Sequence, residues 1–368
     1  MLPLLKIPPL FNLIFTNIDA YSFISVIYAF LMLLALLLIL IGGFTVNKKR
    51  IEQRKGLWQQ NIAGLISQAV FSDEGEAVFY SPETRHLLGK LSFRNYLLSE
   101  LIKAKINLSG SAGQNLKNMY ESLKLDADSR KKLTNRKEHI KAKGVQQLAM
   151  MEQVKYVKKI FRLTNSTNEL VRQEAQCALV GFYGFLGLRF LNVTAYPISE
   201  WQQIQLLNKL NNVDATNFDP LKKWLKSPNE SVVIFALKLA NFYNCNSIYN
   251  DIVNCLHSPA VQVKLYALEY IRKMSVEDSA DQIISHYLVA NKRYQLAVLD
   301  ALSVIGSEKQ ISFVQTQLRN DDNDIKSAAA KCLSQLHPSG TAFLQTQFFA
   351  DQNPWKEIFL QLKTERAA

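Results

Sequence analysis

The sequence predicts an all-α protein in which one transmembrane helix precedes an α-solenoid, a stacked array of helical hairpins. Three observations support this fold class. An uncharged apolar run extends from Phe23 to Val46, glycine and proline are scarce at 14 and 10 of 368 residues, and a motif with fixed internal spacing recurs in the second half. Since a single helical hairpin cannot bury its own apolar face, repeated copies are expected to stack.

The apolar run is long enough to cross a bilayer as one helix. It contains 24 residues, and about 20 are sufficient. Basic residues follow it at once, at 48, 49, 50, 54 and 55, whereas Lys6 and Asp19 cancel on the other side. The excess of positive charge predicts a cytoplasmic C-terminal side and an N-terminus outside. A cleaved signal peptide is the alternative, but its apolar core is shorter, about 7–15 residues.

Three regions are expected along the chain. They are an N-terminal tail and transmembrane anchor at 1–46, a basic membrane-proximal helical region at 47–145, and the solenoid at 146–368. Apolar residues recur at intervals of three or four between Lys48 and Phe71, so the anchor is expected to continue there as a helix. Ser81-Pro82 predicts a helix start.

Two further elements are predicted before the repeats become regular. The run Asp126 to Ser129 is expected to cap a helix that begins at Arg130. A single helix is then expected from about Lys137 to Ile160, because Ile140, Val145, Leu148, Met151, Val154 and Val157 follow helical spacing.

The net charge of +12 is concentrated in one part of the sequence. Residues 48–162 carry 23 Lys and Arg against 11 Asp and Glu, whereas residues 163–368 carry 19 of each. We predict an anionic contact in the basic part, with lipid headgroups first, an acidic protein second and nucleic acid third. A solvated helix face is the alternative. The predicted patch consists of Lys48, Lys49, Arg50, Arg54, Lys55, Arg130, Lys131, Lys132, Arg136 and Lys137.

The repeat is clearest between residues 225 and 329. Leu225-x-Ser-Pro-xxx-Val232-xxx-Ala236 recurs 31 residues later as Leu256-x-Ser-Pro-xxx-Val263-xxx-Ala267, and again as Leu318-x-Asn-Asp-xxx-Ile325-xxx-Ala329. We expect the leucine to end a first helix and the Ser-Pro or Asn-Asp pair to turn the chain and cap a second one. The last two positions of the motif, four residues apart, share the inner face of that second helix.

This pattern resembles HEAT repeats, with Val171-Arg-Gln-Glu-Ala175 as the best match. From the anchor to Trp201 the chain resembles bacterial membrane-anchored HEAT-repeat proteins, on the stretches 139–144, 168–172 and 196–201. The resemblance implies a scaffold of the bacterial inner membrane. Its cytoplasmic solenoid would bind partner proteins, such as a membrane enzyme complex, on the concave face lined by second helices.

Chemical motifs are weak throughout. The four cysteines have no CxxC spacing and the five histidines are scattered, so we predict no catalytic residue, no cofactor and no metal site. Asp321-Asp-Asn-Asp324 lacks the glycine and glutamate of a calcium loop and is expected to cap a helix. Trp201, Trp224 and Trp355 are expected in the core or lining a groove.

Two other functions are alternatives to a protein-binding scaffold. One is a nucleic-acid binder, against which the neutral charge of the repeats argues, and the other is an enzyme with an unrecognised site.

Overall fold

The computed structural model describes residues 20–71, 80–213, 217–276, 279–287, 291–337, 340–348 and 352–367, and every regular element in these ranges is helical. The all-α prediction is therefore confirmed for them. The chain forms two compact units, Met1–Leu125 and Asp126–Ala368. The region limits expected at residues 46 and 145 stay predictions.

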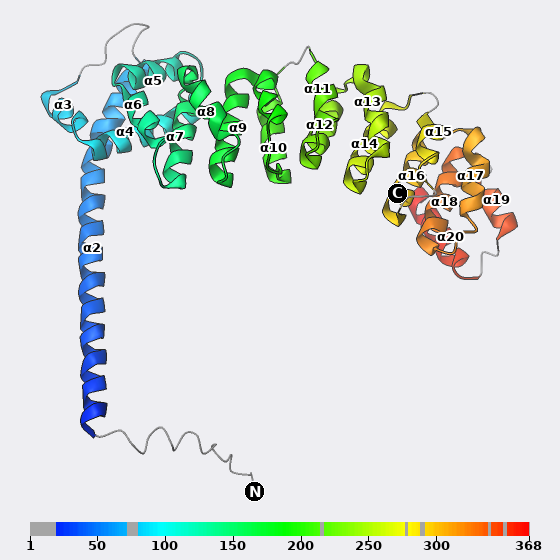
Figure 1. Ribbon diagram of the computed structural model, residues 1–368, viewed down its shortest axis with the longest axis horizontal. Helices are drawn as coiled ribbons and strands as arrows, with labels where there is room; N and C mark the ends of the chain where they lie inside the picture. The colour runs from blue at the N-terminus through cyan, green and yellow to red at the C-terminus, as the bar shows by residue number, and fades with distance from the viewer. Residues whose placement is uncertain are drawn as a thin grey trace. The chain divides into compact units, whose positions relative to one another are not determined.

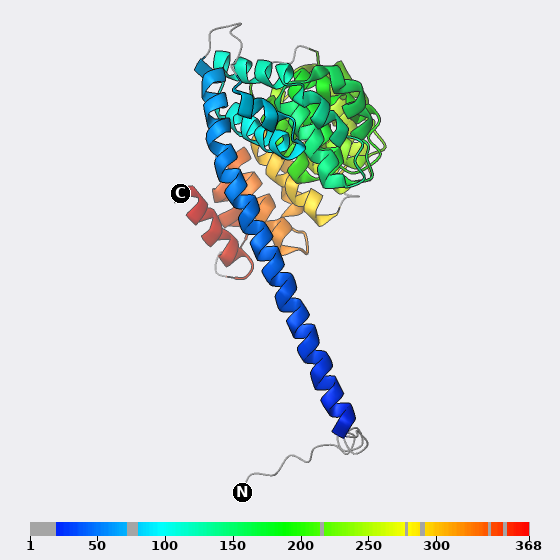
Figure 2. The ribbon, with the colours of Figure 1, turned by 90° about the vertical axis from the view of Figure 1, so that its left-hand side faces the viewer.

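The first unit is built on α2 (Ala20–Phe71), an unbroken helix of 52 residues that Figure 2 shows along its length. Its continuation through Lys48–Phe71 is confirmed. Side chains from Ile24 to Val46 are exposed. Among the described residues α2 is the one helix long and apolar enough, by length and composition, to cross a membrane.

The C-terminal end of α2 packs within the first unit. Ile62, Leu65 and Ala69 are buried, and α2 contacts α4 (Leu91–Asn107) and α5 (Gly110–Ser122). Trp58 meets Phe93 edge to face at 5.6 Å. The short α3 (Pro82–Leu88) begins as predicted, with the Ser81 side chain accepting from the Thr84 N–H. The helix α2 is therefore exposed over its apolar N-terminal half, whereas its C-terminal end packs in a small hydrophobic core.

The second unit is a row of helical hairpins. Figure 1 shows their helices side by side in chain order. The second helices of successive hairpins contact one another from α12 to α18, as do α7, α9 and α10. From α8 onward the first helices pack on their own second helices, and α6 is joined to α7 by hydrogen bonds from Ser129 and Lys132 to Gln147. The first helices and short 3-10 segments are α6 (Leu125–Lys132), η1 (Val154–Tyr156), α8 (Val157–Leu163), η2 (Gly184–Asn192), α11 (Asp219–Trp224), η3 (Asn246–Ile248), α13 (Tyr249–Val253), η4 (Asn254–His257), α15 (Ser279–Ile284), η5 (Glu308–Gln310) and α17 (Ile311–Gln317).

The second helices set the period of the array. They are α7 (Glu138–Met150), α9 (Glu169–Tyr183), α10 (Glu200–Leu210), α12 (Glu230–Tyr243), α14 (Val261–Met274), α16 (Lys292–Ile305) and α18 (Asn323–Leu336), and α19 (Gly340–Gln347) and α20 (Trp355–Ala367) follow. Each of the seven begins 30 or 31 residues after the one before. The chain is therefore a helical-repeat protein, and its repeat includes α7, which precedes the sequence motif.

One local turn precedes five of these seven helices. A Ser or Asn side chain accepts a hydrogen bond from the backbone N–H two residues later, just before the second helix. The pairs are Asn135 and Lys137 at 2.9 Å, Ser166 and Asn168 at 3.3 Å, Ser227 and Asn229 at 3.2 Å, Ser258 and Ala260 at 3.2 Å, and Asn320 and Asp322 at 2.9 Å. Such side-chain turns redirect the backbone without needing one fixed residue type.

The predicted inner positions are confirmed, and the predicted capping residues are partly wrong. Val232 and Ala236 are fully buried, and the small alanine allows neighbouring helices to approach. Ser227 makes the turn, but the cap of α12 is Asn229, which accepts from the Ser231 N–H at 3.1 Å. In the third copy the cap is Asp322, as expected from the acidic run.

Two other expectations are corrected by the structure. The helix expected from Lys137 to Ile160 ends at Met150, because Glu152 has a positive φ of 52° and the chain turns there into η1 and α8. The residues Asp126 to Ser129 lie inside α6 and do not cap it, since α6 already begins at Leu125. In both places the chain makes an ordinary hairpin of the array.

Candidate partner-binding surface

Exposed apolar side chains lie at equivalent positions of neighbouring second helices. At the second position, Leu170 of α9 is 46 % exposed and Trp201 of α10 is 64 % exposed. At the fifth position of four helices in order, α10, α12, α14 and α16 carry Ile204, Ile234, Leu265 and Leu296. Ile204 is 47 % exposed and the other three are half-buried. We call these six residues the apolar ladder.

The ladder is a consequence of the repeat register. Residues that occupy one position of neighbouring second helices lie side by side, since the helices begin 30 or 31 residues apart and stack in the same orientation. The third and seventh positions point inward, as Val232 and Ala236 show. The fifth position is then rotated toward the outer side of the second-helix layer. A row of apolar side chains there forms a more contiguous apolar surface than scattered residues do.

A shallow groove of about 460 Å³ lies on the same layer, between α10, α12 and α14. Its lining includes Leu207, Phe242 and Tyr266 together with Lys238, Glu269 and Lys273. The Lys238 ammonium lies 4.8 Å from the Tyr266 ring centre, and Lys273 donates to the Asn241 carbonyl at 2.9 Å. The groove therefore combines apolar walls with charges held in place.

Polar groups flank the ladder on α9 and α10. Gln202 donates to the Gln173 carbonyl at 3.3 Å and to Cys177 Sγ at 3.5 Å. Burial raises the pKa of the Glu174 carboxyl, and the opposite charge of Lys209 partly offsets this. These contacts fix the spacing of the two helices that carry Leu170 and Trp201.

The tryptophans divide between core and surface. Trp224 is buried and its indole N–H donates to Asn192 Oδ1 at 3.0 Å. Trp355 is buried and stacks on Phe348 at 3.9 Å between ring centres. Trp201 is neither in the core nor one of the residues that line the groove described above. An alignment of the helix starts, which are 30 or 31 residues apart, could have revealed its exposure, because the same position holds His139, Ser231, Gln262, Arg293 and Asp324.

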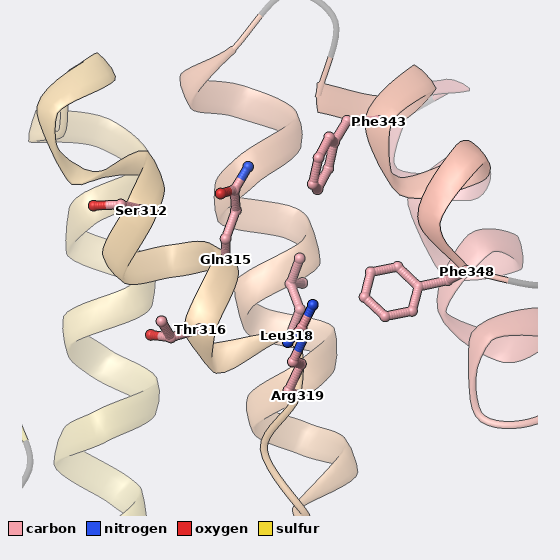
Figure 3. Close-up of a pocket in the computed structure, with 7 residues that line it drawn as sticks. All are labelled: Ser312, Gln315, Thr316, Leu318, Arg319, Phe343 and Phe348. Carbon is pink, nitrogen blue, oxygen red and sulfur yellow. The ribbon is translucent and has the colours of Figure 1, made fainter.

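A second hollow lies in the C-terminal hairpins. It has a volume of about 320 Å³ and is lined by Ser312, Gln315, Thr316, Leu318, Arg319, Phe343 and Phe348. Figure 3 shows Phe343 and Phe348 pointing across it toward α17 and Arg319. It holds one cation and two aromatic rings but no carboxylate or imidazole, so it offers no general acid or base among these residues.

The predicted basic patch is divided between the two units. Lys48, Lys49, Arg50 and Lys55 are exposed on α2, and Arg54 lies on that helix with a side chain outside the described ones. Arg130 and Lys131 are exposed near the end of α6, and Arg136 and Lys137 are exposed in the turn before α7. Lys132 differs from them. Its ammonium donates to Gln147 Oε1 at 2.8 Å, and burial, with Lys143 nearby, lowers its pKa to about 8.

Other candidate groups have structural partners. The rings of His257 and His286 lie 4.4 Å apart, a pair that sequence spacing did not indicate. Within the described part of the chain, no three His, Cys, Asp or Glu side chains gather as metal ligands would. Arg172 of the Val171 motif is buried and donates to the Ser166 carbonyl at 2.7 Å. It therefore secures a turn.

Comparisons with known proteins find only distant similarity to solved structures. No family model matches, and no curated protein matches. Among solved structures, the YibA protein of Escherichia coli is 16 % identical over 70 % of this chain and 98 % of its own, with a TM-score of 0.39. Kap95p, in a structure with RanGDP, is 11 % identical over 84 % of this chain and 46 % of its own, with a TM-score of 0.41. Human deoxyhypusine hydroxylase is 13 % identical over 77 % and 98 %, with a TM-score of 0.30.

Proposed function

We propose that this protein is a membrane-tethered scaffold that binds a partner protein through the second-helix surface of its HEAT-type hairpin array. The observation that carries the proposal is the apolar ladder, in which Trp201 is the most exposed residue at 64 %. Tryptophan is enriched among the residues that dominate binding energy at protein interfaces. An exposed apolar row rimmed by charged and amide groups is typical of a protein-binding surface.

The proposed tether is α2. Its apolar half is exposed along its whole described length and carries no charge between Ile24 and Val46. Such a helix is stable in lipid, where all of its backbone groups bond internally. With basic residues at its C-terminal flank, we place the hairpin array on the cytoplasmic side of the cell membrane. The bacterial inner membrane is the location that follows from the resemblance.

The proposal also assigns binding, not catalysis, to the array. A partner could be a membrane enzyme complex, which a tethered scaffold would hold near the bilayer. The nucleic-acid alternative is less supported, because the groove on the second helices contains Glu269 beside its lysines. A nucleic-acid channel would be expected to carry positive charge without such interruption.

The test is co-purification at native expression from gently solubilised membranes. Wild type is compared with Trp201→Ala and with Leu360→Ala, since Leu360 is also a large exposed apolar residue but lies on α20. We expect the same companion proteins with wild type and Leu360→Ala, and their loss with Trp201→Ala. Recovery of the wild-type chain alone, or equal recovery of partners by all three, would contradict the proposal.

A further inference from the structure

A positively charged surface lies on the layer of the array that the first helices form. The first helices and their following turns, in residues 125–137, 153–166, 184–197 and 217–227, carry thirteen Lys and Arg against three Asp. The equivalent segments of the next three hairpins, 246–258, 279–287 and 308–320, carry two basic and three acidic residues. The excess positive charge of the first-helix layer is thus confined to the first four hairpins.

The basic side chains of α8 are exposed and available to bind a partner. Lys158, Lys159 and Arg162 are exposed, and within the described ranges no carboxylate forms an ion pair with any of them. Lys155, by contrast, pairs with Asp126 at 2.8 Å. On the neighbouring hairpins Arg130, Lys131, Arg189 and Lys223 are exposed as well.

Apolar side chains are exposed among these cations. Val154 and Phe161 lie seven residues apart with Lys158 between them, so all three share one face of the η1–α8 segment. The Val154 side chain is 41 % exposed and the Phe161 side chain is 39 % exposed. Leu186 in η2 and Val193 just after it are exposed, one before and one after Arg189 in the sequence. Unpaired cations around outward apolar residues are the composition of surfaces that lie in a bilayer interface.

We infer that the first-helix layer of the first four hairpins contacts the anionic headgroups of a phospholipid membrane, through Lys158, Lys159, Arg162 and Arg189 with Phe161 and Leu186 inserted among the headgroups. This surface is distinct from the apolar ladder on the second helices. An acidic protein is less favoured because thirteen basic residues spread over four successive hairpins match a continuous anionic surface better than a single acidic patch, and nucleic acid would be expected to meet aromatic stacking platforms in a groove. A bilayer interface accommodates both the cations and the aliphatic side chains.

The experiment measures lysine acetylation by an amine-reactive reagent, residue by residue, on the full chain in nanodiscs. One set of discs is phosphatidylcholine and the other contains phosphatidylglycerol as well. We expect Lys158 and Lys159 to react several-fold more slowly in the anionic discs, and high salt to abolish the difference. Lys309 in η5, which belongs to the seventh first-helix segment, and Lys273 on α14 serve as internal controls and should react equally in both sets of discs.

A charge reversal gives a second measurement. Each basic residue held at an anionic surface contributes about fivefold in binding, so Arg162→Glu should abolish most of the several-fold protection of Lys158 in the anionic discs. Its matched control is Arg319→Glu, an exposed reversal after α17 that should leave the protection unchanged. Equal reactivity of Lys158 and Lys309 in both discs would overturn the inference. The inference would also be overturned, in favour of nucleic acid, if added duplex DNA slowed the acetylation of Lys158 and Lys159 in neutral discs and phosphatidylglycerol had no effect on it.

Discussion

Replacing Trp224 with alanine should destabilise the array far more than replacing Trp201. The Trp224 side chain is 1 % exposed, lies 5.9 Å from Phe185 between ring centres and donates to Asn192 at 3.0 Å. It therefore joins α11 to η2 of the preceding hairpin. Truncating a buried tryptophan costs about 3–5 kcal/mol. The hydrogen bond adds about 1 kcal/mol at most, because exposed Asn192 regains a bond with water. We expect a loss of about 4 kcal/mol.

The assay is urea unfolding of the full chain in detergent micelles, followed by helical circular dichroism. With a denaturant slope of about 3 kcal/mol/M, Trp224→Ala should lower the midpoint by about 1.3 M. Trp201→Ala, at an exposed position, should change the unfolding free energy by less than about 0.5 kcal/mol. If the two variants unfold at the same urea concentration, the assignment of one tryptophan to the core and the other to the surface is wrong.

Three further predictions concern local contacts. Lys132→Met should stabilise the protein at pH 7, since burial disfavours the charged form of the lysine. This gain in stability should shrink as the pH rises from about 8, the lysine pKa in the folded chain, toward 10.5, its pKa in the unfolded chain. Thermal unfolding across this pH range measures the effect. Asn229→Ala should cost about 2 kcal/mol in urea unfolding, because it removes the α12 cap and a hydrogen bond to the Tyr196 carbonyl at 3.1 Å. Alkylation of the native protein at neutral pH should modify half-buried Cys177 before Cys245, whose thiol pKa burial raises to about 12.

The sign of the lysine prediction follows from proton binding. Between pH 8 and 10.5 the unfolded chain holds the Lys132 proton and the folded chain has released it, so wild-type stability rises with pH through this window. Lys131→Met, at an exposed neighbour, should show no such dependence. Asn291→Ala removes a cap that accepts from Tyr294 and should cost only about 1 kcal/mol. Equal losses for the two asparagines, or Cys245 reacting first, would contradict these assignments.

The sequence was sufficient for the features that depend on composition and strict spacing. The long helix through Phe71 followed from an uncharged run and a continued period of three to four. The burial of Val232 and Ala236 followed from a motif that recurs with identical spacing. Both are properties of a single helix face, which a one-dimensional pattern can specify.

Features that depend on a turn were harder to predict. The break at Glu152 was missed because Met151, Val154 and Val157 continue a helical period across it. The hairpin of α6 and α7 was missed because its turn begins with Asn135-Arg136, which matches neither the Ser-Pro nor the Asn-Asp pair of the recognised motif, although the same side-chain hydrogen bond serves all three. The apolar ladder was missed because it spans different helices, and only the 30 or 31-residue step between helix starts brings its members together.

The continuity of α2 has a mechanical consequence. Sharp kinks in helices arise at proline, at glycine pairs or where the hydrogen-bond ladder is interrupted, and α2 remains one helix even through Gly42 and Gly43. At about 1.5 Å per residue, its 52 residues form a rod of about 78 Å. A tilt or rotation imposed on residues 24–46 is therefore transmitted along the helix toward α4 and α5, so the helix can act as a lever.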